Sequence, residues 1–221
     1  EPVTIENLYS QHVSIFLRQG QSRSLFQAPR EQASEISASA AYIATNPPKG
    51  FANSHNPSVI IDVRTEEEYV GGHPPGAYSI PFPHVTNRGC ADPDSECHST
   101  YIGQDPEDFV AAVDALGLPE DALIITMCRT GARSVFAGNL LAGAGYSNVQ
   151  NMWEGFKGRL KQNLGDEDVD LDGENGVDGS PYSGDLDGWA NFAGLPVSYK
   201  LKHWQLYGPH MDLYYTVEGE R

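Results

Sequence analysis

The 221-residue sequence is poor in positive charge, in long apolar runs and in cysteine. Its 14 lysines and arginines face 30 aspartates and glutamates, and the formal net charge of −16 argues against nucleic acid as a partner. No apolar run approaches the roughly 20 residues that a transmembrane helix needs, so we expect no membrane span. The three cysteines divide unevenly, because Cys90 and Cys97 share one polar loop whereas Cys128 stands alone.

The uneven division of the cysteines suggests a compartment. Outside the cytoplasm, it would give a local Cys90–Cys97 disulfide and a free Cys128 thiol. The chain begins at Glu1 rather than Met, which fits a mature exported protein and equally fits trimming of a longer chain. We therefore expect an exported protein, periplasmic or extracellular, that contains this disulfide. The alternatives are two unpaired thiols in a cytosolic protein, or a zinc site with His98 for which the loop has few ligands.

The most informative segment is the hexapeptide Cys-Arg-Thr-Gly-Ala-Arg at 128–133, which directly follows the apolar run 122–127. The apolar run is typical of a buried strand, and the small residues of 131–144 favour a helix. Cys128 is therefore expected where a strand ends and a helix begins, at unpaired N–H groups and a positive helix dipole. This position favours a thiolate and a bound anion, and the two arginines add positive charge. The pattern predicts a nucleophilic sulfur that acts on small anionic substrates.

Strands and helices are expected to alternate over residues 34–153. The β-branched run 59–63 is typical of a buried parallel strand, and Thr65 with Glu68 forms a capping box that begins a short helix. Further strands are expected at 77–82, 122–127 and 148–152, and further helices at 34–46, 106–116 and 131–144. This alternation predicts an α/β fold, doubly wound, with a mainly parallel sheet that helices cover on both faces.

Three blocks of sequence occur in a recognisable order. Residues 61–77 read IDVRTEEEYVGGHPPGA, the Cys128 loop follows, and WEGF at 153–156 comes before Trp189 and AGLPV at 193–197. These blocks resemble the rhodanese family of sulfurtransferases over about residues 34–156 and again near 189–197.

The resemblance implies a thiosulfate sulfurtransferase with a ping-pong reaction and no organic cofactor. Cys128 would attack the outer sulfur of a donor such as thiosulfate, form a persulfide, and pass the sulfur to cyanide or a thiol. The loop residues that would bind the transferred sulfur and its anionic donor are Arg129, Thr130, Gly131, Ala132, Arg133 and Ser134. Asp62 and Arg64 end a strand on the same sheet edge, so we expect them to support the site. Asp62 would bond the loop backbone or an arginine, and Arg64 would form an ion pair.

Loop length separates this function from its alternatives. Relatives of this fold that act on phosphate or arsenate have seven residues from cysteine to arginine, whereas this chain has six. The loop therefore suits a single sulfur better than the tetrahedral oxyanion of a phosphatase or arsenate reductase. A further alternative is a sulfur-relay module, which would carry a persulfide to a protein acceptor with little turnover of its own.

Several segments depart from a minimal domain of this family. We expect an N-terminal extension at 1–32, the rhodanese-like domain at 33–198, an acidic insertion within it at 157–188, and a C-terminal tail at 199–221. Nine acidic residues lie between 166 and 187, and no lysine or arginine occurs from 162 to 199. Such a segment repels itself unless cations neutralise its charge.

The acids of the insertion are regularly spaced. Four of them hold positions 1, 3, 5 and 7 of a loop with Gly173 at position 6, which resembles the first half of an EF-hand calcium loop. Position 12 is Gly179 instead of glutamate, so the likeness is closer to the helix-free acidic loops of extracellular calcium-binding repeats. We expect a structural calcium ion, since the insertion interrupts the last helix rather than the active-site edge; the alternative is a solvated acidic loop. The candidate ligands are Asp168, Asp170, Asp172, Glu174 and Asp178.

Overall fold

The computed structural model describes residues 32–47, 57–88, 100–119, 121–158, 187–191 and 193–219. Strands and helices alternate along most of these residues. In chain order they are β1 (Ser34–Ile36), α2 (Ala38–Thr45), β2 (Ser58–Asp62), α3 (Glu66–Val70), β3 (Tyr78–Ser79), β4 (His84–Arg88), β5 (Thr100–Gly103), α4 (Pro106–Asp114), β6 (Leu123–Met127), α5 (Ala132–Gly143), β7 (Val149–Met152) and α6 (Met211–Gly219). Two 3-10 turns, η2 (His203–Gln205) and η3 (Gly208–His210), precede α6.

Five strands form one parallel sheet in the order β1-β7-β6-β2-β3. From β2 the chain continues to β3 on one side, and from β6 it continues to β7 on the other, so the winding direction reverses between β2 and β6. The register places Asp62, at the end of β2, beside Met127, at the end of β6. Ligands of doubly wound sheets bind at the carboxyl ends of strands at such a reversal. The expected doubly wound, mainly parallel sheet is confirmed.

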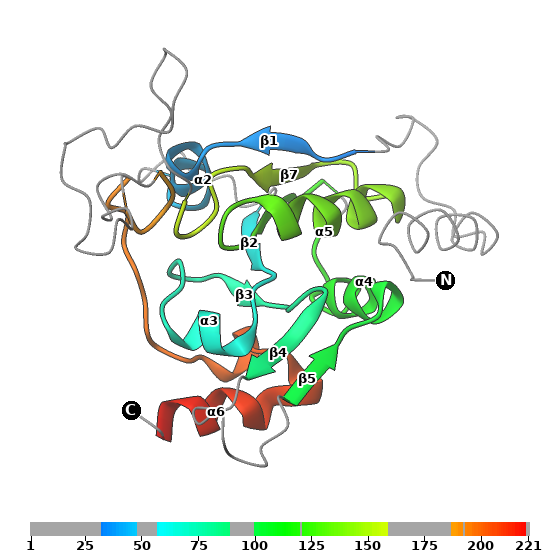
Figure 1. Ribbon diagram of the computed structural model, residues 1–221. Helices are drawn as coiled ribbons and strands as arrows, with labels where there is room; N and C mark the ends of the chain where they lie inside the picture. Colours follow the sequence, from blue (N-terminus) through cyan, green and yellow to red (C-terminus); the bar gives the residue numbers. More distant parts are fainter. Residues whose placement is uncertain are drawn as a thin grey trace, which may run out of the picture.

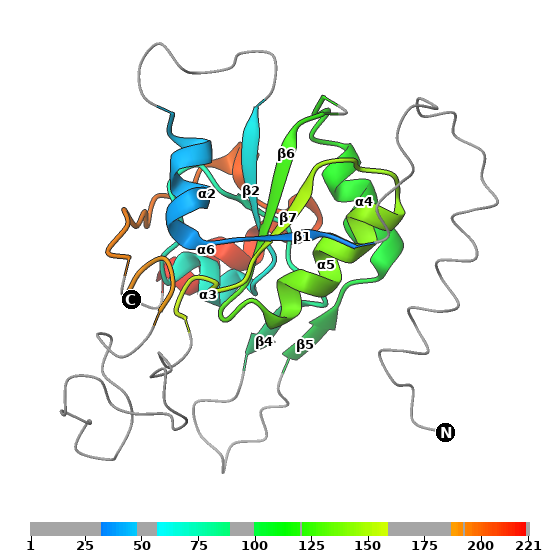
Figure 2. The ribbon, with the colours of Figure 1, turned by 90° about the horizontal axis from the view of Figure 1, so that it is seen from above.

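Helices cover both faces of this sheet. Helices α4 and α5 lie on one side of it, and α2, α3 and α6 lie on the other (Figures 1 and 2). Strands β4 and β5 pair with each other as a separate antiparallel ribbon near α3 (Figure 1). Within the described ranges, none of the helices combines the length and the apolar character that crossing a bilayer requires.

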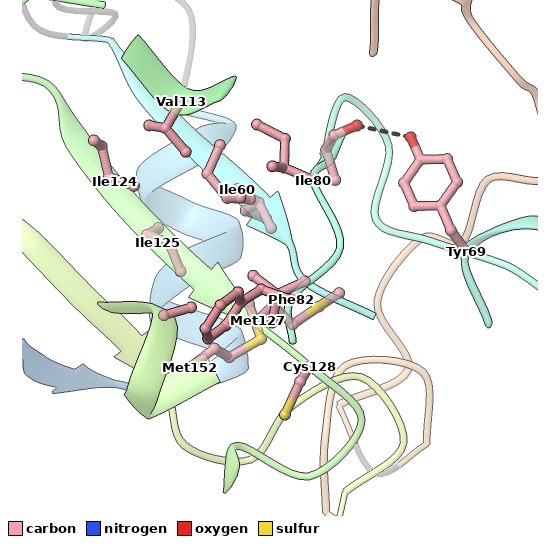
Figure 3. Packing of buried hydrophobic residues seen from close by; sticks show 14 of the residues in the cluster. Ile60, Tyr69, Ile80, Phe82, Val113, Ile124, Ile125, Met127, Cys128 and Met152 are labelled. Atoms are coloured by element: carbon pink, nitrogen blue, oxygen red, sulfur yellow. Dashed lines mark hydrogen bonds between the residues drawn. The ribbon is translucent and has the colours of Figure 1, made fainter. Parts of the chain in front are cut away.

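The two central strands supply much of the core. Ile60 and Ile61 of β2 and Ile124 and Ile125 of β6 are at most 3% exposed, as expected for strands with both faces covered. Each such side chain stabilises the fold by roughly 1.5–3 kcal/mol when it leaves water. Figure 3 shows this packing with Cys128 at its margin. The ends of β2 and β6, which lead into the candidate site, are therefore held by buried strand segments.

Helix α3 begins with the capping box that the sequence predicts. The Thr65 hydroxyl accepts a hydrogen bond from the Glu68 backbone N–H at 3.4 Å, and a Glu68 carboxylate oxygen accepts from the Thr65 N–H at 3.2 Å. These reciprocal bonds satisfy two of the N–H groups that every helix start leaves without a partner. The cap also fixes the Glu68 side chain at the edge of the sheet that carries the site.

Two expectations about element boundaries were wrong. Residues 34–46 form strand β1 before helix α2, because Ser34–Ile36 pairs in parallel with β7 and Ser37 then caps the helix. The expected strand at 77–82 is reduced to β3 (Tyr78–Ser79). Beyond it the chain still bonds to the end of β2, with the Ile80 N–H donating to the Asp62 carbonyl at 3.0 Å.

The residues after Ser198 fold back onto the domain. Helix α6 packs against α3 (Figure 1), and Tyr207 and Tyr214 belong to the buried core. The Tyr214 hydroxyl lies 2.7 Å from the Ser79 hydroxyl at the end of β3. Helix α6 therefore supports α3.

Candidate active site

Cys128 immediately follows β6, and its side chain is 1% exposed. Figure 3 shows its sulfur beyond Met127, on the side away from the apolar cluster. Helix α5 begins four residues after the cysteine, with Gly131 in the left-handed conformation at its N-cap (φ 84°). The strand–loop–helix arrangement that the sequence predicts around Cys128 is therefore present.

The backbone carbonyls of Cys128 and Arg129 accept hydrogen bonds from residues 156–158, which follow β7. The Cys128 carbonyl accepts from the Phe156 N–H at 2.8 Å, and the Arg129 carbonyl accepts from the N–H groups of Lys157 and Gly158 at 2.9 and 3.2 Å. No backbone carbonyl of the described residues accepts from the N–H groups of Arg129, Gly131, Ala132 or Arg133. These donors at a helix start are suited to hold an anionic sulfur.

Two glycines allow the loop to lie directly against the turn that follows β7. A Cβ atom on Gly131 would collide with the Trp153 carbonyl, and one on Gly155 would lie 2.6 Å from the carbonyl carbon of Arg129. Both glycines also have positive φ angles, 84° and 72°, which side chains rarely adopt. The active-site loop and the 153–156 turn therefore act as one packed unit.

Arg133, in the first turn of α5, is paired with Glu68. Its Nη1 and Nη2 atoms lie 2.8 Å from the two carboxylate oxygens of Glu68, a bidentate geometry, and each side chain is 28% exposed. Burial raises the pKa of Glu68, but the hydrogen bonds and charge of Arg133 outweigh it and hold that pKa below its usual value. Burial alone would lower the pKa of Arg133. The hydrogen bond and the charge of Glu68 outweigh burial, so the pKa of Arg133 lies above its usual value. The Arg133 charge is thus fixed near Cys128 and largely matched by a carboxylate.

Asp62 and Arg64 form a second pair beyond the end of β2. Arg64 Nη2 and Nε lie 2.7 and 2.9 Å from the Asp62 carboxylate, and the side chains are 2% and 0% exposed. Arg64 Nη2 also donates to the Gly72 carbonyl at 2.7 Å, and the guanidinium lies 4.1 Å from the centre of the Phe156 ring. These contacts tie β2 to the turn after β7, beneath the active-site loop.

The six loop residues named from the sequence differ in their exposure. Arg129 and Ala132 are exposed, Thr130 and Arg133 are half-buried, and Gly131 and Ser134 are buried. In the part of the chain that the structure describes, no carboxylate pairs with Arg129. The loop therefore presents one arginine to solvent and one arginine that is already paired.

The Ser134 side chain contacts the sulfur from the first turn of α5. Its hydroxyl oxygen is 3.4 Å from Cys128 Sγ and 2.7 Å from Asn151 Oδ1 in β7. Sequence reasoning missed Asn151, and it treated Glu68 as a helix cap alone. The available signal for Asn151 was a polar residue in a four-residue strand, and its neighbour Gln150 gives the same signal.

The base of the acidic insertion lies at the active-site loop, which corrects the expectation that the insertion avoids this edge. The first limb, 155–158, bonds to the loop carbonyls described above. The second limb, 187–191, returns to it: the Trp189 N–H donates to the Gly155 carbonyl at 3.0 Å, and a Cβ atom on Gly188 would lie 2.6 Å from the Gly158 nitrogen. The insertion departs from a turn at the carboxyl end of β7, and parallel strands share that edge with Cys128.

The calcium and disulfide predictions concern other parts of the chain. The five candidate calcium ligands, at 168–178, and the pair Cys90–Cys97 lie outside the described residues. Within the described ranges, no three His, Cys, Asp or Glu side chains cluster in a way that could hold a metal ion.

The chain is similar to several known proteins. Residues 50–162, about half of the chain, match the family of rhodanese-like domains. Thiosulfate sulfurtransferase 16, chloroplastic, of Arabidopsis thaliana is 31% identical over 104 residues, which are 47% of this chain and 75% of the relative. An uncharacterized protein of Rickettsia prowazekii is 29% identical over 104 residues, 47% of this chain and 73% of the relative. The crystal structure of Rv0390 from M. tuberculosis is 22% identical, with a TM-score of 0.42 over 76% of this chain and 99% of that one.

Proposed function

Since the chain belongs to the family of rhodanese-like domains, we propose that it moves a sulfane sulfur from thiosulfate, or a similar small anionic donor, to cyanide or a thiol. The observation that carries the proposal is the position of Cys128, at the end of β6 and under the first N–H groups of α5. Thiosulfate sulfurtransferase 16 of Arabidopsis thaliana, whose name states this activity, supports the choice of donor.

The reaction divides into two displacements at sulfur. The Cys128 thiolate attacks the outer sulfur of thiosulfate, the S–S bond of thiosulfate breaks, and sulfite leaves with the bonding pair. A persulfide, Cys128–S–S⁻, remains on the protein with the charge on its outer sulfur. Cyanide then attacks that sulfur, thiocyanate leaves, and the thiolate is restored. The persulfide splits one transfer into two easier steps, as covalent catalysis does elsewhere.

The loop has a separate task in each step. The N–H groups of Arg129, Gly131, Ala132 and Arg133 stabilise the negative charge on the outer sulfur, since no backbone carbonyl of the described residues accepts from them. Arg129 and Arg133 favour approach of the dianionic donor. Arg129 is exposed and meets the donor first. Arg133 is already paired with Glu68, so only the part of its charge that Glu68 does not neutralise attracts the donor.

The decisive experiment measures thiocyanate formation from thiosulfate and cyanide by wild type and by Cys128→Ser. We expect turnover in the wild type and none above background in the variant. Equal turnover in both proteins overturns the role of Cys128. A persulfide on Cys128 by mass spectrometry without turnover would identify the sulfur-relay module instead, and hydrolysis of an aryl phosphate would indicate a phosphatase.

We further propose that the acids at 168–178 bind calcium in an exported, periplasmic or extracellular protein, with Cys90 and Cys97 joined in a disulfide. The spacing of the acids and the uneven distribution of the cysteines support these proposals. Chelation should lower the melting temperature and added calcium should restore it. An unchanged melting temperature together with no metal by elemental analysis would contradict calcium. Three free thiols by intact mass, in protein secreted under oxidising conditions, would contradict the disulfide.

A further inference from the structure

A chain of hydrogen bonds runs from the edge of the sheet to Cys128. Glu35 of β1 and Asn151 of β7 are register partners in the parallel sheet, and β1 forms the edge beside β7 (Figure 2). Asn151 Nδ2 lies 3.0 and 3.3 Å from the two carboxylate oxygens of Glu35. Asn151 Oδ1 lies 2.7 Å from the Ser134 hydroxyl, which is 3.4 Å from Cys128 Sγ. Glu35 is exposed, whereas the other three side chains are at most 2% exposed.

The Ser134 hydroxyl has one hydrogen and three acceptors around it. The acceptors are Asn151 Oδ1 at 2.7 Å, the Gly131 carbonyl at 3.2 Å and Cys128 Sγ at 3.4 Å. A hydroxyl donates one strong hydrogen bond and accepts through its lone pairs. The shortest contact therefore takes the hydrogen, and Ser134 offers its oxygen to the sulfur.

The Glu35 carboxylate sets the donor-to-acceptor direction of these hydrogen bonds. An ionised carboxylate only accepts hydrogen bonds, so the Asn151 amide must turn its nitrogen to Glu35 and its oxygen to Ser134. In this orientation Ser134 accepts the S–H hydrogen of a Cys128 thiol. A Cys128 thiolate would instead face the lone pairs of the same oxygen.

We propose that Glu35 and Asn151 are positioning residues that set the balance between the thiol and the thiolate of Cys128 through the Ser134 hydroxyl. A half-turn of the Asn151 amide would reverse the chain, because Nδ2 would donate to Ser134 and the Ser134 hydrogen would reach the sulfur anion. The Glu35 carboxylate opposes that turn, since it would face the amide oxygen. The inference rests on the proposed function only in taking Cys128 as the reactive sulfur.

Other charged groups also surround Cys128, and all remain unchanged in the test. They are Arg129 in the loop, Arg133 with its partner Glu68, and the buried pair Asp62 and Arg64. An effect of Glu35 must therefore be separated from the plain loss of one negative charge. Glu154 offers the matched control: it follows β7, is half-buried, and one of its carboxylate oxygens accepts from the Ala38 N–H rather than from Asn151.

The experiment is the rate of alkylation of Cys128 by iodoacetamide as a function of pH, followed by mass spectrometry of the peptide that contains Cys128. Glu35→Gln allows the amide both orientations, and its inflection should move to lower pH by about one unit, a tenfold change in the thiol–thiolate balance. Glu154→Gln removes the same charge without freeing the Asn151 amide, so it should move the inflection by less than about a third of a unit. Equal shifts in the two variants overturn the proposal.

A second pair of variants tests transmission through Ser134. Asn151→Asp can only accept from Ser134 and should move the inflection to higher pH, a change of sign that loss of packing would not produce. In a Ser134→Ala background, Glu35→Gln should cause no shift; a persisting shift overturns the relay. If Ser134→Ala does not fold, the difference between Glu35→Gln and Glu154→Gln decides the question, and equal shifts overturn the proposal. Alkylation needs no sulfur donor, so failure of sulfur transfer leaves this result readable.

Discussion

The two arginine–carboxylate pairs beside Cys128 have similar contact distances and different surroundings. The Asp62–Arg64 pair is almost fully buried, and Arg64 also bonds the Gly72 carbonyl and covers the Phe156 ring. The Glu68–Arg133 pair is bidentate at 2.8 Å, with more than a quarter of each side chain exposed. Burial is therefore what distinguishes the two arginines, more than distance.

The difference in burial gives the two arginines different roles. Removing one partner of a buried pair leaves an uncompensated charge in a poorly solvated place, which is strongly destabilising. A partly exposed pair contributes little to stability, because water replaces each partner. Arg64 is thus committed to holding β2 against the turn after β7, whereas Arg133 is the arginine that, under the proposed function, shares its charge between Glu68 and the anionic donor.

The largest expected effect follows from breaking the buried pair. Arg64→Met should reduce the free energy of unfolding by about 3–5 kcal/mol, since Asp62 is left charged and buried. Urea denaturation at neutral pH measures the change. Lys202→Met, which removes an exposed positive charge, is the control and should leave stability nearly unchanged. A loss below about 1 kcal/mol in Arg64→Met would show that Asp62 is solvated or protonated at little cost.

Glu66 extends the comparison to a carboxyl on the same helix turn whose pKa shifts the other way. Burial raises the pKa of Glu66 from 4.5 to about 7. The folded protein therefore binds more protons than the unfolded chain between these values, so this stability is complete below pH 4.5 and disappears as pH rises through 7. Relative to Glu66→Gln, the wild type should lose about 3 kcal/mol of unfolding free energy across this range. Parallel pH profiles of the two proteins would contradict the raised pKa.

Breaking the half-exposed pair should affect substrate more than stability. Arg133→Met should raise KM for thiosulfate about tenfold, the loss of one charge-assisted contact to the donor. Its free energy of unfolding should fall by only about 1 kcal/mol. Steady-state kinetics and urea denaturation of the same preparation measure both effects, with Lys202→Met as the matched loss of positive charge. A large loss of stability with unchanged KM would make Arg133 a second structural arginine.

The smallest effect is expected at the carboxylate of the same pair. Glu68→Gln keeps an oxygen for the Thr65 N–H and removes the charge, so stability should fall by about 0.5–1 kcal/mol at pH 7. The lowered pKa of Glu68 gives stability that is present above its ordinary value of 4.5 and is lost as pH falls through the folded value. Wild type and variant should therefore converge in thermal unfolding as pH falls through the folded pKa of Glu68. A difference that grows in acid would contradict the ion pair.

Local sequence patterns predicted those parts of the site that are contiguous in the chain. The Cys128 loop lies between an apolar run and a helix, and the Thr65 capping box is complete within four residues, so both were identified correctly. The central strands were found for the same reason, because each is a short β-branched or apolar run.

Contacts between distant residues could not be predicted in this way. Glu68 and Arg133 lie 65 positions apart, and Glu35 and Asn151 lie 116 apart. The three residues of β1 carry no alternation long enough to separate a strand from a helix start, so only pairing with β7 defines them. Only the pairing of β1 with β7 places Glu35 beside Asn151 and so connects it to Cys128.

Gly158 meets Asp187 and Gly188, so the two ends of the acidic segment lie together beside the cysteine loop. The described backbone hydrogen bonds of Cys128, Arg129 and Phe156 are all made with residues up to 158 and from 187 onward. Substitutions between residues 159 and 186 therefore leave the partners of these hydrogen bonds unchanged.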